Sequence, residues 1–139
     1  MLTQAAFKDL LSNCSFNENT ISQKIIVPCL VKISMQSSYN LRNLAFVGGN
    51  REKGNDIEFH EIIGPDKYRL YTGIQVKKGK ITSKIATDLI IQGNQALKKD
   101  ILDPSTGATY RIHRWIVATT DDITQDAKEE IIKELDKFE

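Results

Sequence analysis

The chain has 139 residues, a length that fits one domain built around one hydrophobic core. Apolar residues make up 40% and charged residues 27%, as in an ordinary folded protein, and the net charge of +1 gives no global sign of nucleic-acid binding. No apolar run approaches the ~20 residues of a membrane span. Residues 1–11 lack a basic-then-apolar signal segment, so we expect a cytoplasmic location.

The two cysteines, Cys14 and Cys29, do not form a Cys-x-x-Cys pair. This spacing indicates neither a structural zinc site nor a disulfide framework. Cys29 lies in an apolar run and is expected to be a small buried residue.

Two helices are expected before the first strand. Apolar residues recur at helical spacing over residues 3–13, which predicts a short first helix. A second helix is expected from Thr20 or Ser22, either of which can serve as N-cap, to about Ser34. Pro28 lies inside this segment, so the helix either kinks there or begins later. The predicted apolar stripe consists of Ile25, Ile26, Cys29, Leu30 and Ile33.

Three strands are expected next. Residues 43–47 form a short apolar run that Gly48 and Gly49 close. Residues 56–63 and 69–77 are predicted to pair as an antiparallel hairpin, because the turn residues 64–67 (Gly-Pro-Asp-Lys) stand between them.

The C-terminal part predicts a helix, a strand and a last helix. A helical apolar period extends over residues 83–102, and Gly93 inside it is expected to allow close packing against the sheet. Residues 111–118 are predicted to form a buried strand. Asp122 or Thr124 is the expected N-cap of the last helix.

The expected order is α-α-β-β-β-α-β-α over a single domain, residues 1–139. A strand-helix-strand unit after a hairpin implies a parallel strand pair within a mixed sheet. The predicted fold class is therefore α/β, with a sheet of about four to five strands flanked by helices.

The segment Gly73–Lys80 carries the main functional signal. In a strand, Gln75 and Lys77 share one face, while Ile74 and Val76 share the other. The hairpin turn places Asp56 across from the Gln75–Lys77 pair. The alternative is an edge strand whose polar face is merely solvated.

This juxtaposition brings a carboxylate, an amide oxygen and an ammonium group to one end of the sheet, with Glu58 one step further along the Asp56 face. A hard cation such as Mg²⁺ prefers oxygen ligands together with water and phosphate oxygens. A neighbouring lysine can orient a metal-bound water and neutralise charge that develops on a phosphate.

The pattern Gly54-x-Asp56, hairpin, Gln75-x-Lys77 resembles the PD-(D/E)xK nuclease superfamily, and within it the Mrr-like restriction endonuclease domains of bacterial defence proteins. The resemblance covers residues 20 to 138. Three further runs resemble the Mrr-like pattern: the Glu-Lys-Gly-Asn-Asp-Ile run, a glutamine-bearing helix segment and a strand-loop-helix ending, at residues 52–57, 92–96 and 116–127.

The resemblance implies a restriction-endonuclease-like fold and a metal-dependent DNA endonuclease that uses Mg²⁺ or Mn²⁺. It makes Asp56 the metal-binding aspartate, Gln75 the second ligand and Lys77 the catalytic lysine, with the carbonyl of Val76 as a further metal ligand. Gln92 or Gln95 would steady the site from the following helix.

A neutral glutamine brings one negative charge less than the glutamate of the family pattern, so another carboxylate is expected to compensate. The candidates are Glu52, Glu58 and Glu18, in that order. The family often carries an acid on the helix before the first strand, and the helix expected here offers Gln23 and no glutamate.

Basic residues are expected around the site, where they would suit a phosphate backbone. They are Lys67, Arg69, Lys78, Lys80 and Lys84. The resemblance implies DNA as partner, a homodimer or a larger defence complex, and a role in restriction or antiphage defence. Two alternatives stay open: a nuclease-fold domain that binds DNA or a protein without cutting, and a plain α/β interaction domain.

Overall fold

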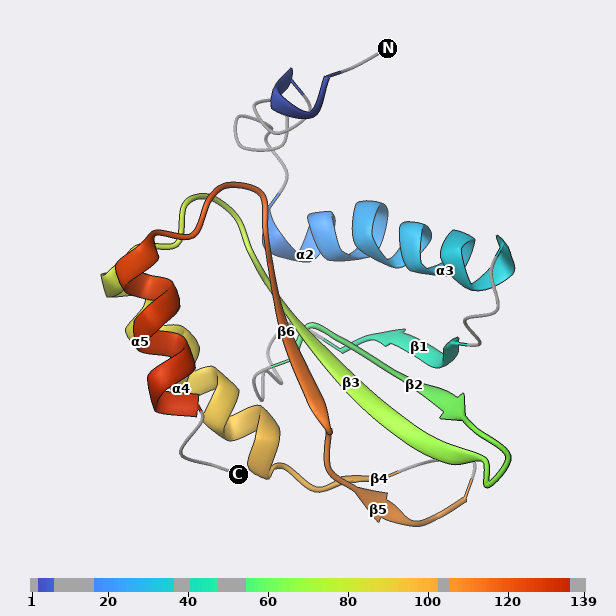
Figure 1. Cartoon of the computed structure of the whole chain (residues 1–139). Coiled ribbons are helices and arrows are strands. Elements are labelled where there is room, and N and C mark those ends of the chain that lie inside the picture. The colour runs from blue at the N-terminus through green and yellow to red at the C-terminus, as the bar shows by residue number, and fades with distance from the viewer. Residues whose placement is uncertain (1–2, 7–16, 37–40, 48–54, 103–105, 136–139) are drawn as a thin grey trace.

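The structure is a computed structural model that describes residues 3–6, 17–36, 41–47, 55–102 and 106–135. At its centre lies a four-stranded mixed sheet in the order β1-β2-β3-β6 (Figure 1). β2 runs antiparallel to β1 and to β3, and β6 runs parallel to β3. This confirms the predicted α/β class with a mixed sheet between helices. The strands are β1 (Leu41–Phe46), β2 (Ile57–Ile63), β3 (Tyr68–Lys77) and β6 (Arg114–Thr119).

Before the sheet, residues 18–36 form an unbroken helix. It consists of α2 (Glu18–Ile21), the π-helical turn η1 (Ser22–Ile26) and α3 (Val27–Gln36). Pro28 lacks an N–H, and its ring collides with the carbonyl four residues earlier in a regular α-helix. The wider π turn just before Pro28 accommodates the ring, so the helix continues where a kink or a later start was expected.

The helix also begins earlier than predicted. Asn17 is its N-cap, and the Asn17 side chain accepts a hydrogen bond from the N–H of Thr20 at 2.8 Å. The π turn moves the buried stripe as well. Ile21 and Leu30 pack toward the sheet, whereas Cys29 is exposed and Ile33 is 47% exposed, so their predicted burial was wrong.

The β2–β3 hairpin forms as predicted. Its turn spans residues 64–67, with the N–H of Lys67 donating to the carbonyl of Gly64 at 3.1 Å. Gly64 has φ +74°, a conformation that glycine adopts without steric cost. The register pairs Ile57 with Ile74, which brings the start of β2 beside the end of β3.

The connection from β3 to β6 contains helix α4 (Ser83–Lys98) and a small hairpin of β4 (Ile101–Leu102) and β5 (Thr109–Tyr110). The predicted helix was too long at its C-terminal end, because Lys99 is already extended. Ile101 continues the apolar period but is buried as a strand residue, which explains the error. The predicted strand likewise started too early.

Gly93 allows the close approach that the sequence predicted, because a Cβ there would lie 2.8 Å from Cζ3 of Trp115 on β6. The last helix, α5 (Gln125–Leu135), packs against α4 over a core that includes Leu89 and Ala127.

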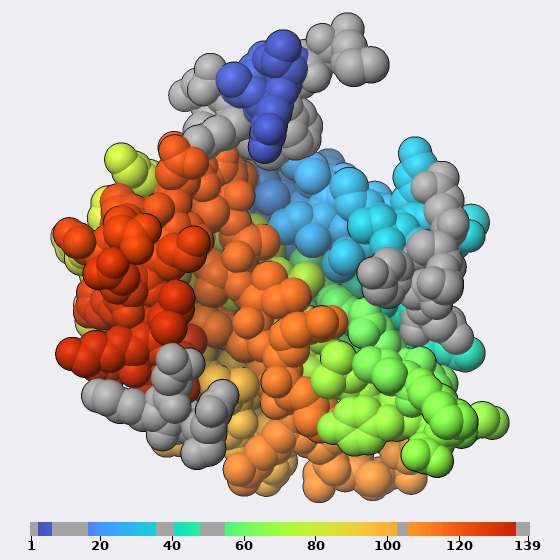
Figure 2. Space-filling view, viewed as in Figure 1, coloured from blue at the N-terminus to red at the C-terminus, as the bar shows by residue number. Residues whose placement is uncertain are grey.

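The elements form three layers, with the 18–36 helix on one face of the sheet and α4 with α5 on the other (Figure 1). The core under the 18–36 helix consists of Ile57, Phe59, Ile74 and Val76 together with Ile21. In Figure 2 the orange atoms of the β6 region reach the surface between α5 and the 18–36 helix.

Of the predicted first helix, the structure describes residues 3–6, of which 4–6 are helical, and the remainder lies outside the described residues. Among the described helices, none combines the length and apolar character that crossing a membrane requires.

Candidate active site at the end of the hairpin

Asp56, immediately before β2, lies at the centre of the candidate site. Its Oδ2 accepts hydrogen bonds from Nε2 of Gln75 at 3.0 Å and from the backbone N–H of Val76 at 2.7 Å. Its own N–H donates to the carbonyl of Ile74 at 2.8 Å. Asp56 and Gln75 are each only 2% exposed. The predicted cross-strand contact of Asp56 with Gln75 is therefore present, and this part of the polar face is not solvated.

Lys77 follows Gln75 by two residues and contacts a different acid. Its Nζ lies 3.8 Å from Oε2 of Glu18, at the start of α2. The expectation that this helix offers no glutamate was wrong, because the N-cap at Asn17 places Glu18 in its first turn. The signal was present in the sequence, since Asn is a preferred N-cap residue.

The backbone around Lys77 is fixed by the neighbouring loop after β6. The N–H of Thr120 donates to the carbonyl of Lys77 at 3.3 Å. Two residues further along the chain, the N–H of Gly79 donates to Oγ1 of Thr120 at 2.8 Å. Oγ1 of Thr119 donates to the carbonyl of Gly79 at 2.6 Å. These bonds join the chain segments that leave the carboxyl ends of the two parallel strands.

Glu58 is buried on the same face of the sheet as Asp56, with 8% exposure. Its Oε1 accepts a hydrogen bond from Nδ2 of Asn55 at 3.1 Å and lies 3.6 Å from Nζ of Lys99. Glu58 is therefore a buried, paired carboxylate and not a solvated strand residue. Its predicted supporting role remains a prediction.

Asn55 was missed by sequence reasoning. Its side chain lies directly over Gly73, so that a Cβ at position 73 would collide with the Asn55 amide group. The sequence signal is a glycine inside a strand, which often marks a close approach of another group.

Two predicted helix residues differ in burial. Gln95 is exposed on α4, while the Oε1 atom of Gln92 is buried and has no hydrogen-bond partner among the described residues. An unpaired buried acceptor is costly, which singles out Gln92 over Gln95 as the candidate with unused bonding capacity. Glu52 lies outside the described residues.

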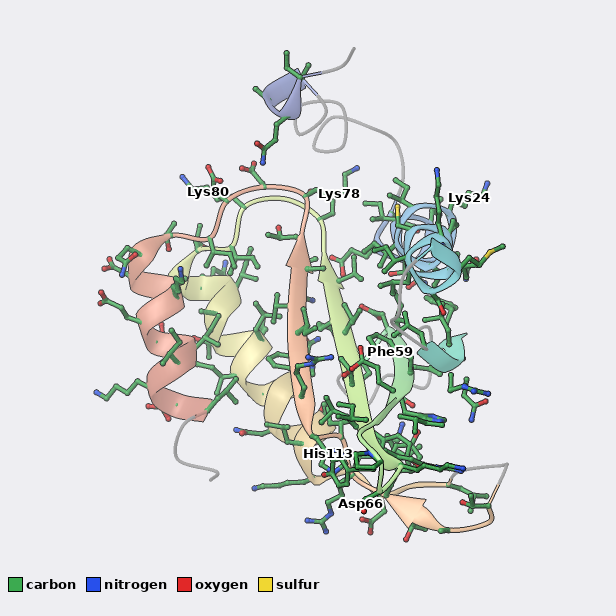
Figure 3. All side chains as sticks on the ribbon, turned by 45° about the vertical axis from the view of Figure 1, so that its right-hand side comes forward. Lys24, Phe59, Asp66, Lys78, Lys80 and His113 are labelled. Atoms are coloured by element: carbon green, nitrogen blue, oxygen red, sulfur yellow. The ribbon has the colours of Figure 1, made fainter. Side chains whose placement is uncertain are left out.

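Figure 3 shows Lys78 and Lys80 at the end of the molecule where β3 finishes, with Lys24 of η1 at the same end. Asp66, in the hairpin turn, lies at the opposite end (Figure 3). Lys67 belongs to that turn, so the prediction that it clusters around the site was wrong, and Arg69 stands near the same end of β3. Lys84 is exposed in the first turn of α4.

The donor set fits a magnesium-type cation held through few protein ligands. Asp56 supplies a carboxylate. Gln75 supplies an amide that contacts Oδ2 of Asp56 through its Nε2–H, and this amide would turn over to offer its oxygen to a cation. Because the N–H and C=O of one strand residue point to the same edge, the Val76 carbonyl also faces Asp56. Mg²⁺ commonly uses one or two carboxylates with waters and phosphate oxygens. Among the described residues, no group of three or more His, Cys, Asp or Glu side chains is placed to hold a metal.

Comparison with known proteins gives one informative match. No family model and no curated protein matches the chain. A solved structure, the MspJI restriction endonuclease in complex with a 27-mer oligonucleotide, superposes with a TM-score of 0.56 at 14% identity. The match covers 94% of this chain and 27% of the MspJI chain. The chain is thus similar in structure to a little over a quarter of that protein, and its fold is restriction-endonuclease-like.

Proposed function

We propose that this protein is a metal-dependent DNA endonuclease of the PD-(D/E)xK type, which hydrolyses phosphodiester bonds. The observation that carries the proposal is the contact of Asp56 with Gln75 and Val76 at the end of β3, next to Lys77. These residues match the order of the nuclease pattern, with Gln75 in place of its acidic residue. The likeness in fold to a restriction endonuclease solved with an oligonucleotide supports DNA as the substrate.

In this proposal Asp56, Gln75 and the Val76 carbonyl hold Mg²⁺ or Mn²⁺. The bound cation would act as a Lewis acid on the phosphate and acidify an attacking water. Lys77 provides a positive charge next to the phosphate and stabilises the charge that develops in the transition state. The burial of Asp56 excludes bulk water from one side of this carboxylate, which strengthens its interactions.

Glu18 is proposed as the compensating carboxylate in place of Glu52. Its ion pair with Lys77 restricts the ammonium group of a side chain that is only 20% exposed. The Glu18 carboxylate also offsets the positive charge of Lys77, which would otherwise repel a cation beside Asp56. Glu18 would therefore orient Lys77 and raise the affinity of the site for a cation.

DNA is proposed to pass over the end of the sheet where Lys78, Lys80 and Lys84 stand, because lysines there neutralise backbone phosphates. The finer assignments are also proposals: an Mrr-like domain in bacterial restriction or antiphage defence, located in the cytoplasm. Cutting both strands of a duplex usually takes two sites, so the working form would be a homodimer or part of a larger complex.

The direct test is cleavage of supercoiled plasmid by the purified chain in Mg²⁺, in Mn²⁺ and in EDTA. We expect nicked and linear products with either cation and none in EDTA. Lys77→Met should abolish cleavage while leaving the circular dichroism spectrum unchanged. Lys67→Met, in the hairpin turn at the far end of β3, is the matched control and should cleave like the unaltered chain.

Cleavage that persists in Lys77→Met would overturn the assignment. Binding of DNA without cleavage in any cation would favour the second candidate, a nuclease-fold domain that binds without cutting. One observation favours that candidate: within the described part of the chain, no three or more His, Cys, Asp or Glu side chains converge where they could hold a metal.

A further inference from the structure

A cavity of about 490 Å³ lies on the Glu58 face of the sheet, between β1 and the β4–β5 hairpin. Its size is within the ~300–1,000 Å³ of small-molecule sites. Most of its wall is apolar and comes from both sides, including Leu44 of β1 and Ile101 of β4. Its polar wall consists of Asn43, Glu58 and Lys99, and its aromatic wall of Tyr71 and Tyr110. An apolar cavity with few convergent polar groups is typical of a ligand site.

A hydrogen bond from Asn55 holds the Glu58–Lys99 pair of the cavity wall in place. Nδ2 of Asn55 donates to Oε1 of Glu58 at 3.1 Å, and Nζ of Lys99 lies 3.6 Å from the same oxygen. The Asn55 side chain can take this position because Gly73 has no Cβ. The Glu58 and Lys99 side chains are 10% and 23% exposed. A carboxylate that accepts hydrogen bonds and an ammonium that donates them are thus fixed side by side at the cavity.

The aromatic wall is ordered. The Tyr71 and Tyr110 rings stack with centroids 3.5 Å apart and an interplanar angle of 15°. His113 stacks against Tyr71 at 5.9 Å and 21°, and His60 packs against it at 5.1 Å. These contacts cover the Tyr71 ring and restrict it to one orientation. A ligand that matches the cavity has an apolar body and carries a donor next to an acceptor.

We propose that this cavity binds a nucleobase. A base edge presents an N–H donor beside a ring or carbonyl acceptor, which complements the Glu58 carboxylate and the Lys99 ammonium. Its ring is apolar on both faces, which suits the aliphatic part of the wall. Glutamate accepting from an amino group of a base and lysine donating to a base carbonyl are established pairings in base readout.

The occupant is a base extruded from the DNA strand near the cleaved phosphate, an assignment that rests on the proposed function. Asp56 and Glu58 are two residues apart on one face, a separation of about 7 Å along a strand. A base that swings out of the stack beside a phosphate at Asp56 can therefore reach Glu58. Bases that enter protein pockets are read through their edges and stacked on aromatic side chains. A free mononucleotide offers the same chemistry, so the experiment separates the two sources.

The test is an NMR titration of the ¹⁵N-labelled chain, without divalent cations, in the Lys77→Met background so that cleavage cannot interfere. The probes are the four deoxynucleoside monophosphates, deoxyribose 5-phosphate, and a short single-stranded oligonucleotide with and without one abasic position. We expect millimolar, saturable shifts at Glu58, Tyr110 and Lys99 with at least one mononucleotide, and about tenfold weaker binding of deoxyribose 5-phosphate. The intact oligonucleotide should produce the same shifts.

Two variants test the cavity itself. Glu58→Gln should weaken mononucleotide binding about tenfold, because a charged acceptor becomes neutral. Leu102→Trp places a large ring at a wall residue that is 63% exposed and should block binding while leaving the Asn55–Glu58–Lys99 contacts intact. Lys98→Met is the matched control, because Lys98 is exposed at the C-terminal end of α4, next to Lys99. This variant should bind normally.

The inference is overturned if no probe gives saturable shifts at these residues up to ~10 mM, a limit weaker than typical weak binding. It is also overturned if deoxyribose 5-phosphate binds as well as the mononucleotides, or if Leu102→Trp binds normally. Shifts with mononucleotides but not with the oligonucleotide would overturn the strand-derived base. Plasmid cleavage by the unaltered chain is a separate readout, so failure of the base site and failure of the nuclease assignment are distinguishable.

Discussion

The two faces of the β2–β3 hairpin differ in chemistry although both are buried. On the face toward the 18–36 helix the buried residues include Ile57, Phe59, Ile74 and Val76, at 0–6% exposure. On the other face they include the polar residues Asp56, Glu58, His60 and Gln75, at 2–8% exposure. Burying apolar carbon stabilises a fold, whereas burying a carboxylate costs free energy unless it is hydrogen-bonded or paired. The polar face therefore carries a cost that the apolar face does not.

The partners on the polar face show how that cost is limited. Asp56 accepts two hydrogen bonds, from Gln75 and Val76, and Glu58 contacts Asn55 and Lys99. A change on this face should therefore alter function when it removes a charge and stability when it removes a partner. A change on the apolar face should alter stability alone.

The largest expected effect is on cleavage. Asp56→Asn keeps the shape and an acceptor oxygen but removes the charge, so we expect plasmid cleavage to fall by at least ~10³-fold, about 4 kcal/mol of transition-state stabilisation. Asp66→Asn, in the hairpin turn at the other end, is the control and should not change the rate. A cleavage rate within tenfold of the unaltered chain would remove Asp56 from the site.

On the apolar face, Ile57→Ala should lower the free energy of unfolding by about 3 kcal/mol, since Ile57 is fully buried and its loss leaves a cavity. Ile63 lies on the same strand but is 45% exposed, so Ile63→Ala should cost clearly less. Urea denaturation followed by circular dichroism measures both. Equal losses in the two variants would contradict the described packing.

A third test concerns the packing of the polar face. Gly73→Ala places a methyl group into the Asn55 side chain, so it should destabilise the fold by about 1–3 kcal/mol through overpacking. Asn55→Gly removes the obstacle, so the double variant Asn55→Gly/Gly73→Ala should lose less than the sum of the single losses. Additive losses in urea denaturation would show that the two side chains do not meet.

A smaller effect is expected for Glu18→Gln. The Glu18–Lys77 pair is partly exposed, with Glu18 at 40%, so its contribution to stability should be at most about 1 kcal/mol after solvent screening. Cleavage should nevertheless fall about three- to tenfold if Glu18 orients Lys77, a modest share of what a positioning residue can supply. Glu61→Gln breaks a pair with Arg114 toward the other end of β3 and should leave cleavage unchanged. Equal rates for Glu18→Gln and the unaltered chain would exclude a role for Glu18.

The hairpin and its cross-strand contact were predictable because they depend on local chemistry. The turn at residues 64–67 fixes the register, and a period of two then fixes which side chains share a face. Asp56 and Gln75 follow from these two facts alone. Gly93 was predictable for a similar reason, since a glycine inside a helix signals a close neighbour, here Trp115.

Other features depend on contacts that no sequence period reports. The π turn before Pro28 rotates the start of the helix relative to its end, which displaced the predicted stripe. Ile101 continued a helical period although tertiary pairing with Tyr110 made it a strand residue. The partners of Glu58 come from Asn55 and from the end of α4, and only the folded chain brings them together.

The smallest expected effect concerns the lysines at the end of the sheet. If Lys80 and Lys84 each contact one phosphate, Lys80→Ala and Lys84→Ala should each reduce the slope of log Kd against log salt by about 0.9. Lys67→Ala, in the hairpin turn at the opposite end, should leave the slope unchanged. Fluorescence anisotropy with a labelled duplex at several salt concentrations, without divalent cations, measures the slope. A change with Lys67→Ala but not with Lys80→Ala would place the DNA at the hairpin turn and separate it from the Asp56 carboxylate.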